Sequence, residues 1–397
     1  MIRRSIPHRP LPYAGAPGRV VLFVKGSGPG GVERVALRLV AGLRAAGVPV
    51  TLLSATFDDA LPAACLIAPR WPLIGARMPM LRLGVSLWRA VRRDPPALIL
   101  CPGNAYTVVA VALKLLLGRR CPPVVAKVSN DLTRRDMSAP LRPLYALWLH
   151  MQGRLIDAFA ALSPAMRDEV AARMGVARGR VHVVPNPALA EADLVSPVPV
   201  RERGPGRRFV AIGRLEPQKD YPAMLRAFAA GAGADDRLTI YGEGSMRPAL
   251  ERLVARLDLA DRVHLAGHCP DAARRLAAQD ILLLSSRYEG QPAAVVEALA
   301  AGLTIVATRC CVGIDGLLDD GALGALVTAG DEAGFARAVA AARPGAQDRV
   351  RALAKARGCT IEAAVPAYAA LFDAVLAGRA DPAPALSPVA PPITRSA

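Results

Sequence analysis

Short apolar runs alternate along most of the chain with stretches whose apolar residues recur at helical spacing. The run from Val20 to Val24 is uniformly apolar, as expected of a parallel strand that is buried on both faces. Residues 32–46 carry apolar side chains three and four positions apart, which predicts a helix, and Gly47 ends that pattern. A second apolar run begins at Val50. The chain therefore starts with a strand, a turn, a helix and a strand.

This alternation continues in two series, separated by the Pro-rich and charged residues 188–207, which are typical of a linker. Strands are predicted at 97–100, 124–128, 158–162 and 181–184 in the first series, and at 209–212, 238–241, 263–265, 281–284 and 304–306 in the second. Helices of the second series are predicted at 221–231, 246–257, 271–278 and 292–301. Alternating strands and helices predict an α/β fold with doubly wound parallel sheets. We expect two Rossmann-like domains that face a cleft, at residues 1–190 and 191–378, and a disordered Pro/Ala/Ser-rich tail at 379–397.

The charge balance adds an electrostatic expectation. The chain has 50 Lys and Arg against 33 Asp and Glu, a formal net charge of +17. This excess favours anionic partners: phosphorylated substrates, an anionic membrane surface or nucleic acid. No nucleic-acid motif or basic patch interleaved with aromatic residues accompanies the charge. Residues 69–93 mix Arg with Trp, Met and Leu, which fits either a segment lying on an anionic bilayer or an amphipathic helix covering the sheet.

Cysteine usage and the N-terminus indicate a cytoplasmic location. Seven Cys are present without a Cys-x-x-Cys pair, and the N-terminus lacks an apolar segment of the secretory kind. The longest apolar stretch, residues 97–118, contains Pro102, Gly103 and Lys114, so it predicts a strand, a loop and a helix rather than a membrane span. We expect a cytoplasmic protein, with peripheral association at the inner face of the cell membrane as a further expectation from its charge.

The most distinctive chemistry lies between residues 286 and 302. Glu289 occupies a Gly- and Pro-containing turn directly after the apolar run 281–284, and Glu297 lies inside the helix that Pro292 opens. One carboxylate is therefore at a strand's end, and the other is about a turn and a half into the next helix. This spacing suits the two ends of one elongated polar ligand, and the helix N-terminus between them favours an anion.

This segment resembles the Glu-x7-Glu motif of retaining glycosyltransferases of the GT-B fold, in family 4. The resemblance extends from residue 19 to residue 375. Each short motif is weak alone, but their shared order and spacing are specific. The other matching motifs are Gly30-Gly31-Val-Glu-Arg34, Val184-Pro-Asn-Pro187, Gly213-Arg214-Leu-Glu-Pro-Gln-Lys219 and Tyr241-Gly-Glu-Gly244.

The resemblance implies a nucleotide-diphosphate sugar as the donor, UDP-linked rather than GDP-linked. It implies that Arg214 and Lys219 neutralise the leaving diphosphate, that Glu289 orients the transferred sugar and that Glu297 binds the ribose hydroxyls. No metal or other cofactor is then needed, and the chain has no Asp-x-Asp motif. The remaining substrate-binding residues that it implies are Gly30, Gly31, Asn130, Asn186, Gly242, Gly290, Gln291, Pro292, Ala293 and Ala294.

The acceptor side departs from the family pattern. Many relatives carry a His after the strand that matches residues 124–128, whereas this chain has Lys127-Val-Ser-Asn-Asp131. Asn130 or Asp131 then handles the acceptor, with Asp131 as the candidate catalytic base, or the donor phosphate receives the acceptor's proton.

The expected function is a retaining, metal-independent glycosyltransferase. Its acceptor is a glycan or lipid-linked sugar in bacterial surface polysaccharide synthesis. Glycosidases also use two carboxylates, but theirs flank one bond about 5–9.5 Å apart. The offset of Glu297 along a helix and the upstream Arg214 and Lys219 favour transfer over hydrolysis. The alternatives are a GT-B-like sugar-nucleotide epimerase and, in another class, a basic nucleic-acid-binding protein.

Overall fold

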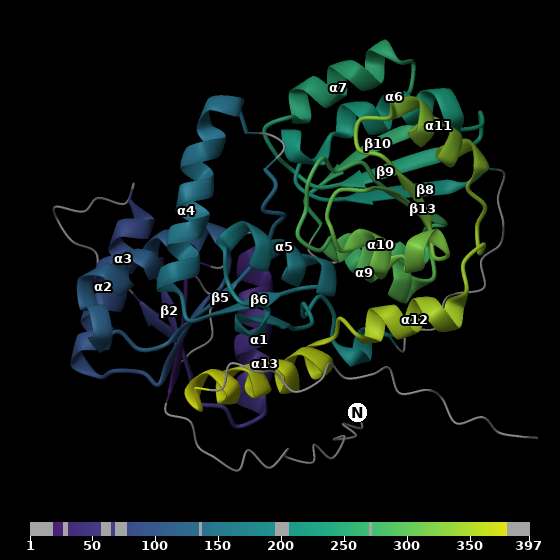
Figure 1. Ribbon diagram of the computed structural model, residues 1–397. Coiled ribbons are helices and arrows are strands. Elements are labelled where there is room, and N and C mark those ends of the chain that lie inside the picture. Colours follow the sequence, from purple (N-terminus) through teal and green to yellow (C-terminus); the bar gives the residue numbers. More distant parts are fainter. Residues whose placement is uncertain are drawn as a thin grey trace, which may run out of the picture.

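The computed structural model describes residues 19–26, 31–56, 65–67, 78–134, 137–194, 206–269 and 272–378, which form two lobes (Figure 1). In the N-terminal lobe all strands pair in parallel, in the order β3-β2-β1-β4-β5-β6-β7. The strands are β1 (Val20–Val24), β2 (Val50–Ser54), β3 (Cys65–Ile67), β4 (Leu98–Cys101), β5 (Val124–Lys127), β6 (Ala158–Ala161) and β7 (Val181–Val183).

The C-terminal lobe contains a second parallel sheet, in the order β10-β9-β8-β11-β12-β13. Its strands are β8 (Arg208–Ile212), β9 (Arg237–Tyr241), β10 (Val263–Gly267), β11 (Ile281–Leu284), β12 (Thr304–Thr308) and β13 (Ala325–Val327). The strand order reverses direction at β1/β4 in one sheet and at β8/β11 in the other, the point at which doubly wound sheets bind ligands. The α/β, two-domain prediction is confirmed.

Helices cover both faces of each sheet because each carries one apolar face. In α1 the buried residues Ala36, Leu39 and Leu43 recur at helical spacing and pack with the strands of the first sheet. The longer helices of the N-terminal lobe are α1 (Gly31–Ala45), α2 (Pro79–Arg93), α3 (Thr107–Leu117), α4 (Arg142–Leu155) and α5 (Pro164–Met174). Those that follow along the chain are α6 (Tyr221–Gly231), α7 (Arg247–Arg256), α8 (Ala272–Arg275), α9 (Ala293–Ala301), α10 (Ile314–Leu317), α11 (Glu332–Ala341), α12 (Arg349–Arg357) and α13 (Ile361–Leu376).

The last helix corrects the predicted domain boundary. The prediction assigned residues 191–378 to one domain, but α13 crosses back and lies beside α1 of the N-terminal lobe (Figure 1). Its buried Tyr368 and Phe372 join the core that β1, β2 and β4 form with α1. The large apolar face of α13 is therefore covered by the first lobe and ties the two lobes together. The predicted tail and residues 195–205 of the predicted linker lie outside the described residues.

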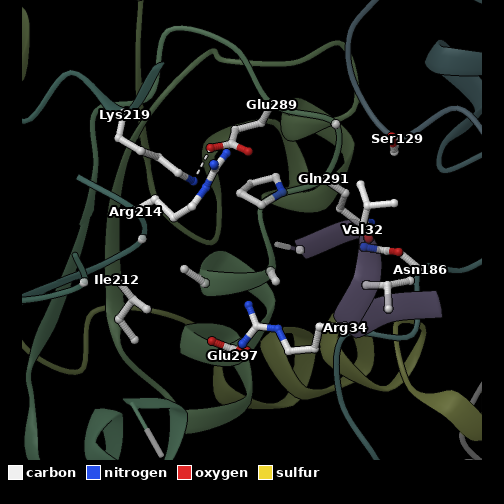
Figure 2. Close-up of a pocket in the computed structure, with 18 of the residues that line it drawn as sticks. Val32, Arg34, Ser129, Asn186, Ile212, Arg214, Lys219, Glu289, Gln291 and Glu297 are labelled. Carbon is white, nitrogen blue, oxygen red and sulfur yellow. Dashed lines mark hydrogen bonds and ion pairs between the residues drawn. The ribbon is translucent and has the colours of Figure 1, made fainter. Parts of the chain in front are cut away.

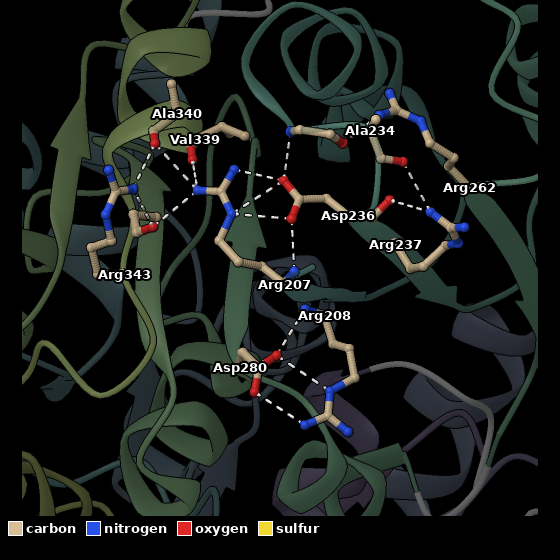
Figure 3. Close-up of polar contacts among 12 residues, drawn as sticks. Arg207, Arg208, Ala234, Asp236, Arg237, Arg262, Asp280, Val339, Ala340 and Arg343 are labelled. Carbon is tan, nitrogen blue, oxygen red and sulfur yellow. Dashed lines mark hydrogen bonds and ion pairs between the residues drawn. The ribbon is translucent and has the colours of Figure 1, made fainter. Parts of the chain in front are cut away.

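Part of the positive charge is used inside the C-terminal lobe, at the amino ends of its strands (Figure 3). Arg207 forms an ion pair of 2.6 Å with the buried Asp236 and also donates to the carbonyl oxygen of Val339 at 2.8 Å. Arg208 pairs with Asp280 at 3.3 Å. These arginines connect β8, β9 and β11 at the end of the sheet opposite the cleft, so they are structural rather than a surface for anionic partners.

Candidate active site

A cavity of about 620 Å³ lies between the lobes, at the carboxyl ends of the strands of both sheets. Its walls bring together residues that lie far apart in the sequence. Those from the N-terminal lobe are Gly31, Val32, Arg34, Val35, Arg38, Lys127, Ser129, Asn130, Leu162 and Asn186. Those from the C-terminal lobe are Ile212, Gly213, Arg214, Gln218, Lys219, Tyr241, Gly242, Glu243, His268, Cys269, Glu289, Gly290, Gln291, Pro292, Ala293, Ala294 and Glu297.

Two of the predicted catalytic residues contact each other on the C-terminal wall. The Lys219 ammonium forms an ion pair with the Glu289 carboxylate, and Ser286 Oγ donates to the same Glu289 oxygen at 2.8 Å (Figure 2). With these contacts from Lys219 and Ser286, Glu289 lines the cavity together with Lys219. A charged pair at this depth is held in one geometry by its hydrogen bonds.

The two loops that carry this pair are tied to each other. Ser285 Oγ donates to the Lys219 carbonyl oxygen at 2.7 Å, and the Gln218 side-chain amide donates to the Tyr288 carbonyl oxygen at 2.8 Å. The Arg287 N–H in turn donates to the Gln218 carbonyl oxygen at 2.8 Å. The loop after β8 and the loop after β11 therefore form one rigid unit, which fixes the spacing of their charged side chains.

Arg214 extends into the cavity beside this pair (Figure 2). Its guanidinium makes no hydrogen bond or ion pair with another residue in the described part of the chain, so its fork of donors remains available to a ligand. The backbone beside it is crowded: Gly242 has a φ of 155°, and a Cβ there would overlap the Gly213 carbonyl oxygen. Glycine at 242 is thus required for the close approach of the β8 and β9 loops.

Glu297 lies on α9 and faces charged groups of the other lobe. Its side chain is buried, and burial raises the pKa of its carboxyl, while Arg34 and Arg38 of α1 oppose that rise. Figure 2 shows Arg34 directed toward Glu297. Burial, together with the neighbouring Arg34, lowers the pKa of Arg38. The sequence prediction did not include either arginine, because their approach to Glu297 depends on how the lobes meet.

The lobes touch where Glu289 leads into α9. The Asp131 N–H donates to the Glu289 carbonyl oxygen at 3.1 Å, and a Cβ on Gly290 would overlap the Ser129 carbonyl oxygen. Gly290 therefore allows a backbone-to-backbone contact across the cleft. Residues 291–294 follow at the N-terminus of α9, where the helix dipole favours an anion.

The N-terminal wall contains a buried lysine that the sequence prediction did not assign to the site. Lys127 ends β5, is 5% exposed, and donates to Asn186 Oδ1 at 2.8 Å. Burial lowers the pKa of Lys127 to about 7. A lysine inside the otherwise apolar run 124–128 was the available sequence signal, because a charge rarely occupies a buried strand without a function or a partner.

The predicted base, Asp131, does not line this cavity. It lines a smaller neighbouring cavity of about 180 Å³, together with Arg287, Cys310 and Cys311. Its carboxylate accepts a hydrogen bond from the Thr133 N–H at 2.7 Å. Burial and a hydrogen bond with Asp131 raise the pKa of Glu169 to about 7. The turn at residues 131–133 directs Asp131 away from the large cavity, whereas Asn130 lines it.

The structure thus brings most of the predicted site into one cavity. Apart from Asp131 and Gly30, which lies outside the described residues, every predicted catalytic or substrate-binding residue lines it. Their roles stay predictions. Among the described residues, no three His, Cys, Asp or Glu side chains are grouped as a metal site would require. No helix in the same residues has the length and apolar character needed to cross a membrane.

Two family models match, one on each lobe. The model described as Glycosyltransferase Family 4 matches residues 29–188, and that described as Glycosyl transferases group 1 matches residues 206–342. With the paired sheets and the cavity between them, these matches show that the chain belongs to the GT-B glycosyltransferases of group 1.

Sequence relatives match parts of the chain. The lipopolysaccharide core biosynthesis glycosyltransferase LpsE of Rhizobium meliloti is 33% identical over 130 residues, which are 33% of this chain and 37% of that protein. The lipopolysaccharide 1,6-galactosyltransferase of Escherichia coli is 30% identical over 186 residues, 45% of this chain and 50% of that protein. The chain therefore spans half or less of the length of these relatives.

Solved structures match over nearly the whole chain. The apo lipopolysaccharide outer core galactosyltransferase WaaB has a TM-score of 0.66 at 18% identity, over 91% of this chain and 99% of that one. Anabaena HepE in complex with UDP has a TM-score of 0.62 at 17% identity, over 92% of this chain and 96% of that one. At these identities the likeness shows the fold alone.

Proposed function

We propose that this protein transfers a sugar from a nucleotide-diphosphate donor, UDP-linked, to a glycan or lipid-linked acceptor in bacterial surface polysaccharide synthesis. The proposed transfer proceeds with retention of anomeric configuration and without a metal. The observation that carries the proposal is the convergence of Arg214, Lys219, Glu289 and Glu297 on one cavity between the lobes. Together they match the parts of such a donor: two phosphates, a sugar and a ribose diol.

The arrangement of positive charges in the cavity suits a diphosphate leaving group. Arg214 offers a planar fork and Lys219 a compact charge, and both lie in the wall that ends at the α9 N-terminus. As the bond between the sugar and the phosphate breaks, negative charge grows on the diphosphate. Fixed cations and helix N–H groups stabilise that charge more than they stabilise the ground state, which is how such a site lowers the barrier.

Glu289 and Glu297 suit the two uncharged ends of the donor. Glu297 is a buried acceptor that can take hydrogen bonds from the two adjacent ribose hydroxyls. Glu289 lies beside the cation pair, where it can orient the hydroxyls of the transferred sugar and stabilise positive charge at the anomeric carbon. On this view catalysis is mainly orientation and electrostatics.

The donor and acceptor classes rest on the relatives. Anabaena HepE, which has a similar fold, was solved in complex with UDP and in complex with UDP-glucose. Sequence relatives are named for lipopolysaccharide synthesis, and one from Campylobacter jejuni for a diphospho-undecaprenol acceptor. These names support a UDP-sugar donor and an acceptor of bacterial surface glycan synthesis.

A peripheral membrane contact is part of the proposal. In α2, Leu83, Leu87 and Val91 are buried in the core, so this helix covers the sheet. Residues 69–77 of the predicted membrane segment lie outside the described residues. Several exposed leucines lie on α3 and α4, which pack together: Leu116 is 71% exposed, and Leu115, Leu144 and Leu147 are similarly exposed. Exposed Arg119 and Arg120 follow α3 directly. Leucines with adjacent arginines suit an anionic lipid surface.

Vesicle sedimentation tests this contact. Wild type is expected to bind vesicles that contain anionic lipid and to lose binding when Leu115 and Leu116 are replaced by Ser. The matched control is Val350→Ser, at an equally exposed apolar residue on α12 of the other lobe. Equal sedimentation of all three proteins would remove the α3–α4 surface from the proposal.

The transfer itself is tested by a donor panel. UDP-, GDP-, ADP- and TDP-sugars are screened for thermal stabilisation and for donor consumption, with and without EDTA, and product configuration is read by NMR. The expected result is selective stabilisation by UDP-sugars, EDTA-resistant turnover and a retained anomer. Epimer formation from the donor alone would favour the sugar-nucleotide epimerase. A nucleic-acid association constant whose logarithm falls steeply with the logarithm of the salt concentration would favour the nucleic-acid-binding protein.

A further inference from the structure

The N-terminal wall of the cavity carries a buried cation without an acidic partner. Lys127 Nζ donates to Asn186 Oδ1, and this is its one hydrogen bond in the described part of the chain. An ammonium has three donors, so two point elsewhere, and the side chain lines the cavity. Burial lowers the pKa of Lys127, and no carboxylate of the described residues opposes that shift. A buried charge in this condition is stabilised by a counter-ion.

The other charged groups on this wall do not supply one. Arg34 and Arg38 of α1 are cationic as well. The acids that act on them are Glu297 of the opposite lobe and Asp193, and neither acts on Lys127. His182 of β7 lies two strands from Lys127 in the sheet register, and burial lowers its pKa. Asp131, four residues after Lys127, is engaged with the Thr133 N–H outside the cavity. The wall is therefore electropositive.

Asn186 completes a receptor for an anionic oxygen. Because the ammonium can only donate, Asn186 presents Oδ1 to it, and the Asn186 NH₂ group is then free to donate. Asn186 is itself 5% exposed and lines the same cavity as Lys127. Lys127 N–H and Asn186 N–H donors side by side can bind two oxygens of one carboxylate or phosphate.

We propose that Lys127 and Asn186 bind a carboxylate or phosphate group of the sugar substrate, on the acceptor or on the transferred sugar. This inference rests on the proposed function and names the chemistry of its substrate. The donor's diphosphate is not the group concerned, because Arg214 and Lys219 in the opposite lobe are available to it. The protein is thus selective for an acidic sugar or a sugar phosphate.

Binding of this anion is coupled to protonation of Lys127. With its pKa lowered to about 7, Lys127 is partly neutral near pH 7, and a bound anion favours the ammonium form. Anion affinity therefore falls as the pH rises above 7, and binding takes up protons. If Lys127 instead acted as a general base in the reaction, activity would rise as the pH increases over the same range.

Calorimetry with matched charged and neutral probes tests the site. In the acceptor arm, UDP-saturated protein is titrated with glucose 6-phosphate, glucuronate and glucose. In the donor arm, free protein is titrated with UDP-glucuronate and UDP-glucose. In one arm, wild type is expected to prefer the anionic probe by about tenfold or more, which is the lower bound for a hydrogen bond to a charged group. The arm that shows the preference identifies which sugar carries the anion.

Two variants assign the preference to this wall. Lys127→Met removes the cation, and Asn186→Asp is nearly isosteric but places a carboxylate against Lys127; both are expected to abolish the preference. Lys355→Met, which removes a lysine on α12 outside the cavity, is expected to keep it. UDP affinity is expected to stay within about threefold of wild type in Lys127→Met, since the diphosphate contacts other residues.

The outcomes separate this inference from the proposed function. No preference for the anionic probe in either arm, or a preference that survives in both variants, overturns the inference while UDP binding by wild type keeps the proposed function. A loss of UDP affinity in Lys127→Met as large as in Arg214→Ala also overturns it, because Lys127 would then hold the diphosphate. Failure of wild type to bind any nucleotide refutes the proposed function itself.

Discussion

The ion pair between Lys219 and Glu289 joins the residue expected at the donor's diphosphate to the residue expected at the transferred sugar. Ser286 Oγ donates to the same Glu289 oxygen at 2.8 Å, which orients the carboxylate. A diphosphate that approaches Lys219 competes with Glu289 for the ammonium. Donor binding and the orientation of Glu289 are thereby linked, because each phosphate contact that Lys219 makes releases the carboxylate toward the sugar.

Glu289→Gln separates these two roles. The variant keeps the side chain's size and removes its charge, so the diphosphate becomes the main anionic partner of Lys219. We expect UDP to bind at least as tightly as to wild type, while turnover falls about 100-fold or more, the size of effect seen when one electrostatic contact to a transition state is removed. UDP calorimetry and donor consumption measure the two quantities. Glu332→Gln, at a partly exposed acid paired with Arg226 outside the cavity, is the control. A larger loss of UDP affinity than of turnover in Glu289→Gln would contradict the assignment.

Arg214→Ala tests the guanidinium that has no ion pair in the described residues. Loss of a charge-assisted hydrogen bond to the diphosphate should weaken UDP binding by about 1.5–3 kcal/mol, or about 10- to 150-fold. Because the contact is to phosphate, uridine should bind both proteins equally. Arg252→Ala, at an exposed arginine on α7, should leave both ligands unaffected. Equal weakening of UDP and uridine by Arg214→Ala would mean that Arg214 acts on the nucleoside or on the fold.

Glu297→Gln tests the ribose contact. Wild type is expected to bind UDP more tightly than 2′-deoxy-UDP, because the Glu297 carboxylate accepts hydrogen bonds from the ribose diol. The difference in binding free energy should be about 1.5 kcal/mol or more, as for a hydrogen bond to a charged group. The variant should lose most of that difference while keeping its affinity for 2′-deoxy-UDP. Calorimetry with both nucleotides measures it. A variant that discriminates as wild type does would clear Glu297 of the ribose role.

The strands and the donor half of the cavity could be predicted because their signals are local. Uniform apolar runs mark buried strands, and the acids and cations of the C-terminal lobe lie in short motifs directly after such runs. The strands β3 and β13 were not predicted; each has three residues and lies at the edge of its sheet. The prediction also made 271–278 one helix, which the structure divides into α8 and a 3-10 turn at Leu276–Ala278.

Features that depend on long-range packing could not be predicted. The crossing of α13 to α1 depends on which lobe covers Tyr368 and Phe372. The local sequence around these residues does not indicate which lobe that is. The direction of Asp131 is set by a turn that bonds its carboxylate to the Thr133 N–H. The approach of Arg34 and Arg38 to Glu297 requires the two lobes to meet, which no motif within one lobe specifies.

The buried pair of Arg207 and Asp236 predicts an acid-sensitive C-terminal lobe. Burial alone would raise the pKa of Asp236, but hydrogen bonds from the Arg207 side chain and from the Arg207 and Gly233 N–H groups outweigh it and lower the pKa. An aspartate ordinarily has a pKa of about 3.9. Because the folded value is lower, the pair's stabilisation is fully present above about pH 4 and is lost as the pH falls through the folded pKa.

Asp236→Asn should therefore destabilise the protein by about 3 kcal/mol near neutral pH, as expected when one partner of a buried pair is removed. The difference from wild type should shrink below about pH 4, since wild type loses the same contribution there. Thermal unfolding of both proteins across this range measures the difference. Asp261→Asn, at an exposed acid of the same lobe, should follow wild type throughout. If the deficit of Asp236→Asn stayed constant down to the acid transition, ionisation of Asp236 would not be the source of the stability.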